Sequence, residues 1–135
     1  MEFQLNERLA NGGYDFETVS GCRVLLKKNA LYPWFVLVPE VSDEITELHQ
    51  MERALYDAVT GLIYDLSAFI QEYFQCDKVN VGAVGSVVRQ LHIHVVGRNE
   101  GDAAWPGVVW GCSVKEPYED QKVEEIKQAF LNVFA

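Results

Sequence analysis

One stretch, Gln90–Val96, constrains the fold more than any other part of the sequence. Successive side chains of a β-strand point to opposite faces of its sheet. One face of this stretch carries three apolar side chains, Leu91, Ile93 and Val95. The other face carries Gln90 and two of the three histidines in the chain, His92 and His94. The alternation predicts a strand that packs on the core on one side and presents both imidazoles on an open surface on the other.

The two histidines at this spacing allow three interpretations. They can be polar residues on the solvent side of a half-buried antiparallel strand. They can hold a metal ion, although a catalytic zinc site usually has three protein ligands, and the remaining histidine, His49, is expected on the exposed face of a helix. They can also act in catalysis, because one neutral imidazole can attack phosphorus while the other donates to a phosphate oxygen or leaving group.

The stretch Gln90–Val96 resembles the histidine triad (HIT) motif, in which three histidines alternate with apolar residues, with Gln90 in place of the first histidine. The resemblance extends from about Leu25 to Gly111. It includes a loop of small residues, a strand that ends in a Val-Pro turn, and a tail typical of a bacterial branch with Gln at the first position. These segments are Asn80–Ser86, Leu31–Pro39 and Ala104–Gly111.

Proteins of this family hydrolyse or transfer nucleoside monophosphate groups through a covalent intermediate on the middle histidine, so the resemblance implies that His92 is the nucleophile. It implies that His94 contacts the phosphate, and that Asn80 and Ser86 bind or position it. Gly85 leaves room for a ligand to approach the backbone. The implied substrate is a dinucleoside polyphosphate, a nucleoside phosphoramidate or another phosphate-bearing small molecule, with no cofactor and no metal. The implied assembly is a homodimer with one continuous sheet.

The hydrogen bond that orients His92 can come from a backbone carbonyl, so Gln90 is expected to tune the reaction rather than enable it. A glutamine side chain cannot carry a proton at neutral pH. Trp34 stands where some relatives carry a further active-site histidine. Ala30 falls near an acidic residue that relatives use on the ribose, and Glu40 replaces a common basic residue. Two alternatives therefore remain: a nucleotide-binding or interaction protein without catalysis, and, less favoured, a metal-dependent enzyme that uses the histidine pair.

Hydrophobic periodicity predicts the remaining elements. Apolar residues recur every three or four positions over 45–73, which indicates helix, and a second such stripe follows Pro117. The family resemblance implies that the first pattern is a short helix followed by a long one. A short helix over 3–10 and four further strands are expected, the strands at 14–19, 22–28, 34–38 and 78–84. This order predicts an α+β fold in one domain, 1–135: an antiparallel sheet of about five strands with one long helix and a C-terminal helix.

The segment from Arg98 to Gly111 is rich in glycine and carries Trp105 and Trp110. Tryptophans in such a loop usually fold back over an apolar surface. That surface can be the core, a subunit interface or a cleft for a nucleotide base.

The composition of the chain limits which molecules it is expected to bind and in which cellular compartment it is expected. The formal net charge of −9 argues against general binding to nucleic acids, which depends on neutralising phosphates. The same charge repels a phosphate-bearing substrate, so binding must rest on local donors such as backbone N–H groups, Arg89 or Arg98. The three cysteines are widely spaced, which fits reduced thiols. Neither a signal-peptide pattern nor an apolar run of ~20 residues is present in the sequence, so a cytoplasmic protein with no membrane partner is expected.

Overall fold

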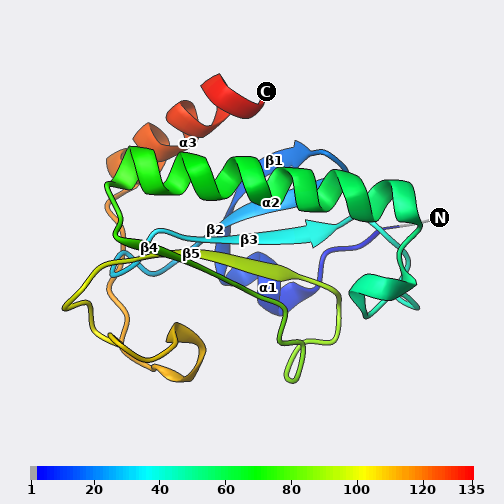
Figure 1. Ribbon diagram of the computed structural model, residues 1–135, viewed down its shortest axis with the longest axis horizontal. Helices are drawn as coiled ribbons and strands as arrows, with labels where there is room; N and C mark the ends of the chain where they lie inside the picture. Colours follow the sequence, from blue (N-terminus) through cyan, green and yellow to red (C-terminus); the bar gives the residue numbers. More distant parts are fainter. Residues whose placement is uncertain (1–2) are drawn as a thin grey trace.

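The computed structural model describes residues 3–135. These residues form an antiparallel sheet of five strands in the order β1-β2-β3-β5-β4 (Figure 1). The strands are β1 (Gly13–Val19), β2 (Cys22–Lys27), β3 (Trp34–Pro39), β4 (Lys78–Gly82) and β5 (Ile93–Arg98). The helices are α1 (Glu7–Asn11), α2 (Arg53–Phe74) and α3 (Asp120–Phe134), with short 3-10 helices η1 (Leu48–Gln50) and η2 (Val109–Gly111). The predicted α+β fold is confirmed, including the five-stranded sheet, the long helix and the C-terminal helix.

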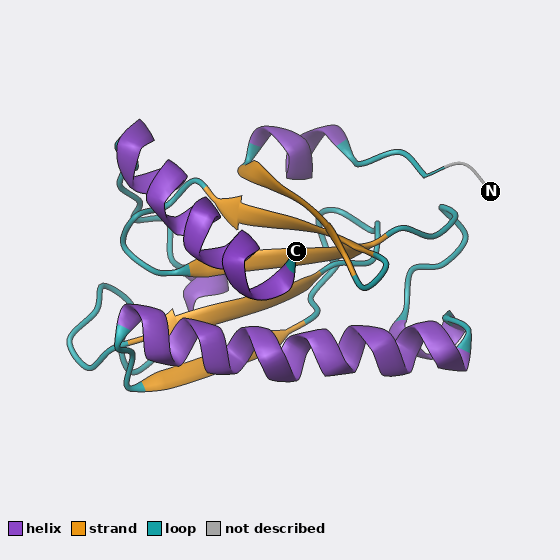
Figure 2. Cartoon of the chain, turned by 90° about the horizontal axis from the view of Figure 1, so that it is seen from above, coloured by secondary structure: helices purple, strands orange, loops and turns teal. Residues whose placement is uncertain are grey.

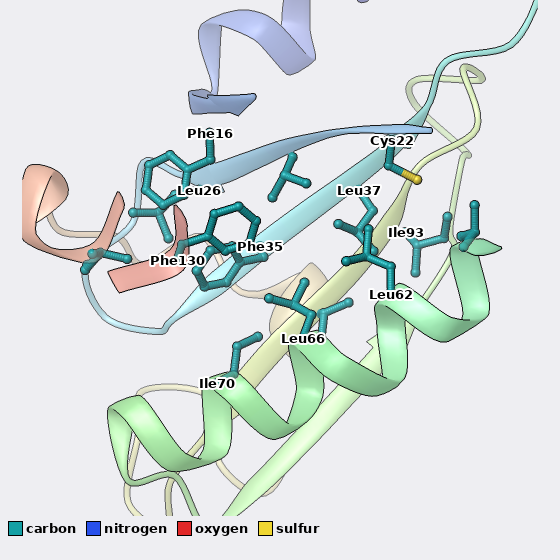
Figure 3. Close-up of a cluster of buried hydrophobic side chains, with 14 of the residues drawn as sticks. Phe16, Cys22, Leu26, Phe35, Leu37, Leu62, Leu66, Ile70, Ile93 and Phe130 are labelled. Atoms are coloured by element: carbon teal, nitrogen blue, oxygen red, sulfur yellow. The ribbon is translucent and has the colours of Figure 1, made fainter. Parts of the chain in front are cut away.

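Helix α2 packs on the sheet through one apolar face, as its periodicity predicts. The buried residues of this face are Val59, Leu62, Leu66 and Ile70. They meet inward-facing side chains of the strands and of α3, and Figure 3 shows Leu37, Ile93 and Phe130 in this main core. The core therefore holds the apolar side of β5 against α2.

Shorter segments cover the opposite face of the sheet. Figure 1 shows α1 on the other side of the strands from α2, and Figure 2, seen from above, shows α2 and α3 in front of the strands. Leu9 of α1 packs against a second apolar cluster, whose buried members are Leu25, Tyr32, Trp34, Val36, Val38, Val96 and Val109. This second cluster lies on the histidine side of β5, because Val36 is aligned with His94 in the ladder between β3 and β5.

Strand β5 begins at Ile93, so the prediction of a strand that starts at Gln90 is wrong. The ladder with β3 ends at Ile93 and the ladder with β4 ends at His94, which leaves the preceding residues without a strand on either side. The alternation of faces nevertheless continues, since Leu91 is also buried in the main core.

Other boundaries shift by smaller amounts. The helical pattern over 45–73 divides as predicted into η1 and α2. Strand β4 ends at Gly82, short of the predicted 84, and the N-terminal helix occupies Glu7–Asn11 instead of 3–10. Among residues 3–135, no helix combines the length and apolarity that a membrane crossing requires.

Candidate active site

His92 immediately precedes β5 and is 7% exposed. Its Nδ1 lies 2.7 Å from the backbone oxygen of Gln90. A carbonyl oxygen only accepts hydrogen bonds, so in the neutral ring Nδ1 carries the proton and Nε2 carries the lone pair. The predicted backbone carbonyl is therefore present. His92 presents the unprotonated ring nitrogen that a nucleophile needs.

His94 has the opposite arrangement. Nε1 of Trp34 lies 2.9 Å from Nδ1 of His94. An indole N–H only donates, so Nδ1 accepts and the ring proton is on Nε2. Burial, the nearby His92 and the charge of Lys27 lower the pKa of His94 to about 4. His94 is therefore a neutral hydrogen-bond donor at pH 7, next to His92, with 5.0 Å between the two ring centroids.

The prediction of an open surface around the histidines is wrong. His94 is 9% exposed, and the rings of Trp34 and Trp110 lie against it at centroid distances of 5.6 and 5.4 Å. Trp110 packs closely here because Gly82 has no side chain: a Cβ at this position would lie 2.8 Å from Cζ2 of Trp110. The core, a subunit interface and a base cleft were the surfaces predicted for this tryptophan. In the structure, Trp110 packs against buried residues of the second apolar cluster and against His94.

The side chain of Gln90 binds the N-terminal segment. Its Oε1 accepts from the N–H of Asn6 at 2.7 Å, and its Nε2 donates to the oxygen of Gln4 at 2.9 Å. An amide side chain offers one acceptor and a donor together, so it can pair with a backbone segment as a peptide group does. Gln90 thus contacts His92 through its backbone and holds the N-terminal segment with its side chain.

The three predicted phosphate-binding residues lie in different surroundings. Asn80 is on the histidine side of β4, as predicted, but its Oδ1 accepts from Nη1 of Arg98 at 2.8 Å. Gly85 has a φ of 67° and lines the same cavity as His92. Ser86 follows in the loop between β4 and β5 and is absent from the described residues that line that cavity.

The cavity beside His92 has a volume of about 730 Å³. Its walls come from the η1 region, the start of α2 and the loop that leads into β5. Three basic side chains line it: His49, Arg53 and Arg89. The prediction that His49 is exposed is correct, but sequence analysis missed its position at the same cavity as His92. Glu47 lines the cavity as well, so two arginine charges face one carboxylate there, whereas the whole chain carries a net charge of −9.

Arg98, a predicted candidate for phosphate binding, is instead committed to a buried ion pair. Its side chain is 2% exposed, and its Nε and Nη2 donate to the carboxylate of Asp102 at 2.8 and 2.9 Å. The guanidinium lies 5.6 Å from the ring centroids of Tyr32 and Trp105. This pairing lowers the pKa of Asp102. Arg98 therefore holds the loop after β5, whereas Arg89 lies at the cavity.

Within residues 3–135, no three His, Cys, Asp or Glu side chains lie close enough together to hold a metal ion. Both Nδ1 atoms of the histidine pair already have hydrogen-bond partners from the protein. The pair therefore offers an ion only its Nε2 atoms.

Comparison with known families matches the HIT domain over residues 16–101. No curated protein matches the chain. A histidine triad protein from Marinobacter aquaeolei VT8 is 36% identical, with 99% of this chain and 97% of that chain covered and a TM-score of 0.94. One from Bradyrhizobium japonicum is 30% identical, with full coverage of both chains (100% each) and a TM-score of 0.94. One from Sinorhizobium meliloti 1021 is 33% identical, with 96% of each chain covered and a TM-score of 0.92. The chain therefore belongs to the histidine triad family, a superfamily of nucleotide-binding hydrolases and transferases.

Proposed function

We propose that this protein hydrolyses or transfers a nucleoside monophosphate group through a covalent intermediate on His92. The observation that carries the proposal is the opposite protonation of the two neighbouring imidazoles. His92 has its lone pair on Nε2 because its Nδ1–H faces a carbonyl, and His94 has its proton on Nε2 because its Nδ1 faces an indole N–H. The substrate is of the dinucleoside polyphosphate or nucleoside phosphoramidate type.

In the first step, Nε2 of His92 attacks the α-phosphorus. An N–P bond forms, and the bond from phosphorus to the leaving group breaks, so that the leaving group departs with the electron pair and takes a proton from water. The carbonyl of Gln90 holds the Nδ1 proton and stabilises the positive charge that develops on the ring. His94 donates its Nε2–H to a phosphate oxygen. In the second step, water or another hydroxyl group attacks phosphorus and releases its proton to solvent, the N–P bond breaks, and its electron pair returns to Nε2.

The cavity supplies the donors that the acidic chain otherwise lacks. Arg89, Arg53 and His49 line it together with Gly85, where the absence of a side chain lets a ligand approach the backbone. We therefore place the substrate in this cavity, with its reacting phosphate at His92. Gln90, in the place of the first histidine, supports assigning the chain to a bacterial branch of the family in which glutamine takes that position.

The test is a screen of dinucleoside polyphosphates, nucleoside phosphoramidates and nucleotide sugars for turnover that depends on His92. His92→Ala should abolish turnover, apart from the residual acceleration that binding alone provides. Mass spectrometry should detect the intermediate after a basic quench but not after an acidic one, because a phosphoramidate is acid-labile. Full activity of His92→Ala would exclude this mechanism.

A second variant tests the donor role of His94. Trp34→Phe removes the N–H that holds His94 in its Nε2–H form but keeps an aromatic ring at that place. We expect kcat to fall by about tenfold or more, with a smaller change in KM, because a donor to the developing charge is typically worth ~10²–10³ and the other tautomer replaces it only in part. NMR of the ring nitrogens should show a single tautomer in the parent and a mixture in the variant.

Nucleotide binding without efficient turnover is the second candidate function. It is favoured by the low pKa of His94, about 4, and by the commitment of the Gln90 side chain to the N-terminal segment. Neither side chain supplies a proton to the leaving group at pH 7. Micromolar nucleotide binding by a parent protein that shows no His92-dependent turnover in the screen would favour this candidate.

We further propose that the protein is a homodimer in which β4 strands pair across the interface. Strand β4 lies at an edge of the sheet. Large apolar side chains on β4, on the loop after it and on α2 are exposed, namely Tyr64, Val81, Val84 and Val87. An exposed apolar strand edge is a surface that another chain can cover.

A further inference from the structure

The third histidine of the chain lies at the cavity of the candidate active site. His49 belongs to η1, and its exposed side chain lines the same cavity as His92. His94 lies beside His92, with 5.0 Å between the two ring centroids. All three histidines of the sequence are therefore gathered at one site, although His49 is far from the other two along the chain.

The turn that carries His49 is held in place by hydrogen bonds and by the core. The side-chain oxygen of Gln50 accepts from the backbone N–H groups of Thr46 and Glu47, at 2.9 and 3.0 Å. The N–H of Gln50 in turn donates to the backbone oxygen of Glu47 at 3.1 Å. Met51, directly after the turn, is 7% exposed and belongs to the main core. The fold thus fixes the place from which the His49 side chain reaches the cavity.

Two segments of the chain bound this cavity, residues 46–56 and residues 83–92. His92, the proposed nucleophile, belongs to the second segment. In a displacement at phosphorus, the leaving group departs on the side opposite to the nucleophile. A group expelled by His92 in this cavity therefore moves away from residues 83–92 and towards residues 46–56, the segment that carries His49.

A leaving group such as an amine needs a proton as its bond to phosphorus breaks, and neither His94 nor the Gln90 side chain supplies one at pH 7. Among the side-chain types on segment 46–56, histidine is the one that ordinarily takes up and releases a proton between pH 5 and 8, whereas arginine keeps its proton. The His49 ring has no ion pair with any carboxylate in residues 3–135. The ring is therefore available for proton transfer.

We propose that His49 donates a proton to the leaving group in the first step and accepts one from the attacking hydroxyl group in the second. The inference rests on the proposed function, because it takes the attack by His92 as given. When the bond from phosphorus to the leaving group breaks, its electron pair stays on the leaving atom and binds the proton of the His49 imidazolium. The neutral ring then takes the proton of the water or other hydroxyl group that attacks phosphorus. His49 thus takes the place of solvent in both proton transfers.

The test compares two substrates that give the same intermediate on His92 but differ in the leaving group. One is AMP joined through a P–N bond to an alkyl amine, which needs a proton to leave. The other is the p-nitrophenyl ester of AMP, whose nitrophenolate leaves without one. His49→Gln should lower kcat/KM for the phosphoramidate by ~10²–10⁴, the usual contribution of a general acid, and should change it little for the ester.

Arg53→Gln is the matched comparison, because Arg53 lies on the same segment and lines the same cavity. An arginine supplies charge but no proton. This variant should therefore leave the ratio of kcat/KM between the two substrates at its parent value, whatever it does to their binding. A selective loss of phosphoramidate turnover as large as that of His49→Gln would overturn the inference.

Equal losses for both substrates in His49→Gln, or no loss for either, overturn the inference and leave the covalent mechanism intact. The same holds for a parent protein that uses His92 to hydrolyse only the ester. A parent that hydrolyses neither substrate overturns both proposals, so the failure of His49 as the proton donor is distinguishable from the failure of the proposed function.

Discussion

His92 and His94 are two residues apart, yet their rings carry the proton on different nitrogens. The partner of His92 is the backbone of Gln90, also two residues away, and its presence could be predicted from the sequence. The partner of His94 is the indole of Trp34, on a neighbouring strand. That contact depends on the register between β3 and β5, which no local pattern around the histidines reveals.

The low pKa of His94 predicts a loss of stability in mild acid. Its folded pKa, about 4, lies below the ordinary value of 6.5. Between these values the unfolded chain binds a proton that the folded chain excludes, so the free energy of unfolding falls as the pH decreases through this range. From pH 7 to pH 5 we expect a loss of about 2 kcal/mol from this residue. Urea unfolding at both pH values measures it.

His94→Gln provides the control for this experiment, because glutamine does not titrate and can still accept from Trp34. The difference in stability between pH 7 and pH 5 should be about 2 kcal/mol smaller in this variant. Equal pH dependence in the two proteins would show that His94 protonates as freely in the folded chain as in the unfolded one.

At the scale of the element, the two faces of β5 have different roles. One face packs in the main core and stabilises the fold, and the other carries His94 of the candidate active site. Ile93→Ala truncates a side chain in the main core and should lower the free energy of unfolding by about 2–5 kcal/mol. Val133→Ala on α3, at 62% exposure, is the control and should change it by less than about 0.5 kcal/mol. Urea unfolding curves compare them. Similar losses in both variants would mean that Ile93 does not pack against α2.

The N-terminal segment depends on a single side chain of the motif. Gln90→Glu removes the donor to the oxygen of Gln4 and brings a carboxylate towards that oxygen, so the segment should detach. Hydrogen exchange at the amide of Asn6 should become faster by about tenfold or more, because the bond of a peptide N–H to a side chain is worth roughly 1 kcal/mol and the lost packing adds to it. Exchange in β5 should not change.

Gln90→His is the informative companion variant. This variant should also release the N-terminal segment but keep the hydrogen bond from His92 to the backbone carbonyl of residue 90. Its kcat/KM should therefore stay within a few tens-fold of the parent value, a smaller change than the ~10²–10⁴ of a full acid–base contribution. A complete loss of activity in Gln90→His with an intact fold would show that the glutamine side chain acts in the chemistry.

The elements could be predicted where periodicity is strong, as in α2 and the apolar side of β5. The start of β5 could not, because it is set by where the ladders of β3 and β4 end. The burial of His94 could not be predicted either. Trp110, which covers it, lies after β5 in the chain and occupies the space that a side chain at position 82 would fill. Position 90 reads as part of an active site, but the partners of its side chain lie at the far end of the chain.

At the scale of the whole molecule, the proposed dimer predicts a particle of about twice the mass of the 15.3 kDa chain. Light scattering after size exclusion measures this mass. Val81→Lys places a charge on the β4 edge and should yield monomers, because a charged edge strand resists pairing. Val133→Lys adds the same charge to an exposed position on α3 and should remain dimeric. A monomeric parent at micromolar concentration would contradict the proposed assembly.

The hydrogen bond that orients His92 starts from the main chain of residue 90, so every amino acid that can stand at that position supplies it. The side chain at position 90 is not needed to align the imidazole, so it can form other contacts. In this protein the side chain forms hydrogen bonds to the backbone of Gln4 and Asn6. A search pattern that demands a third histidine at this place therefore tests the identity of a side chain, whereas the alignment of His92 depends on a carbonyl oxygen that every residue type carries.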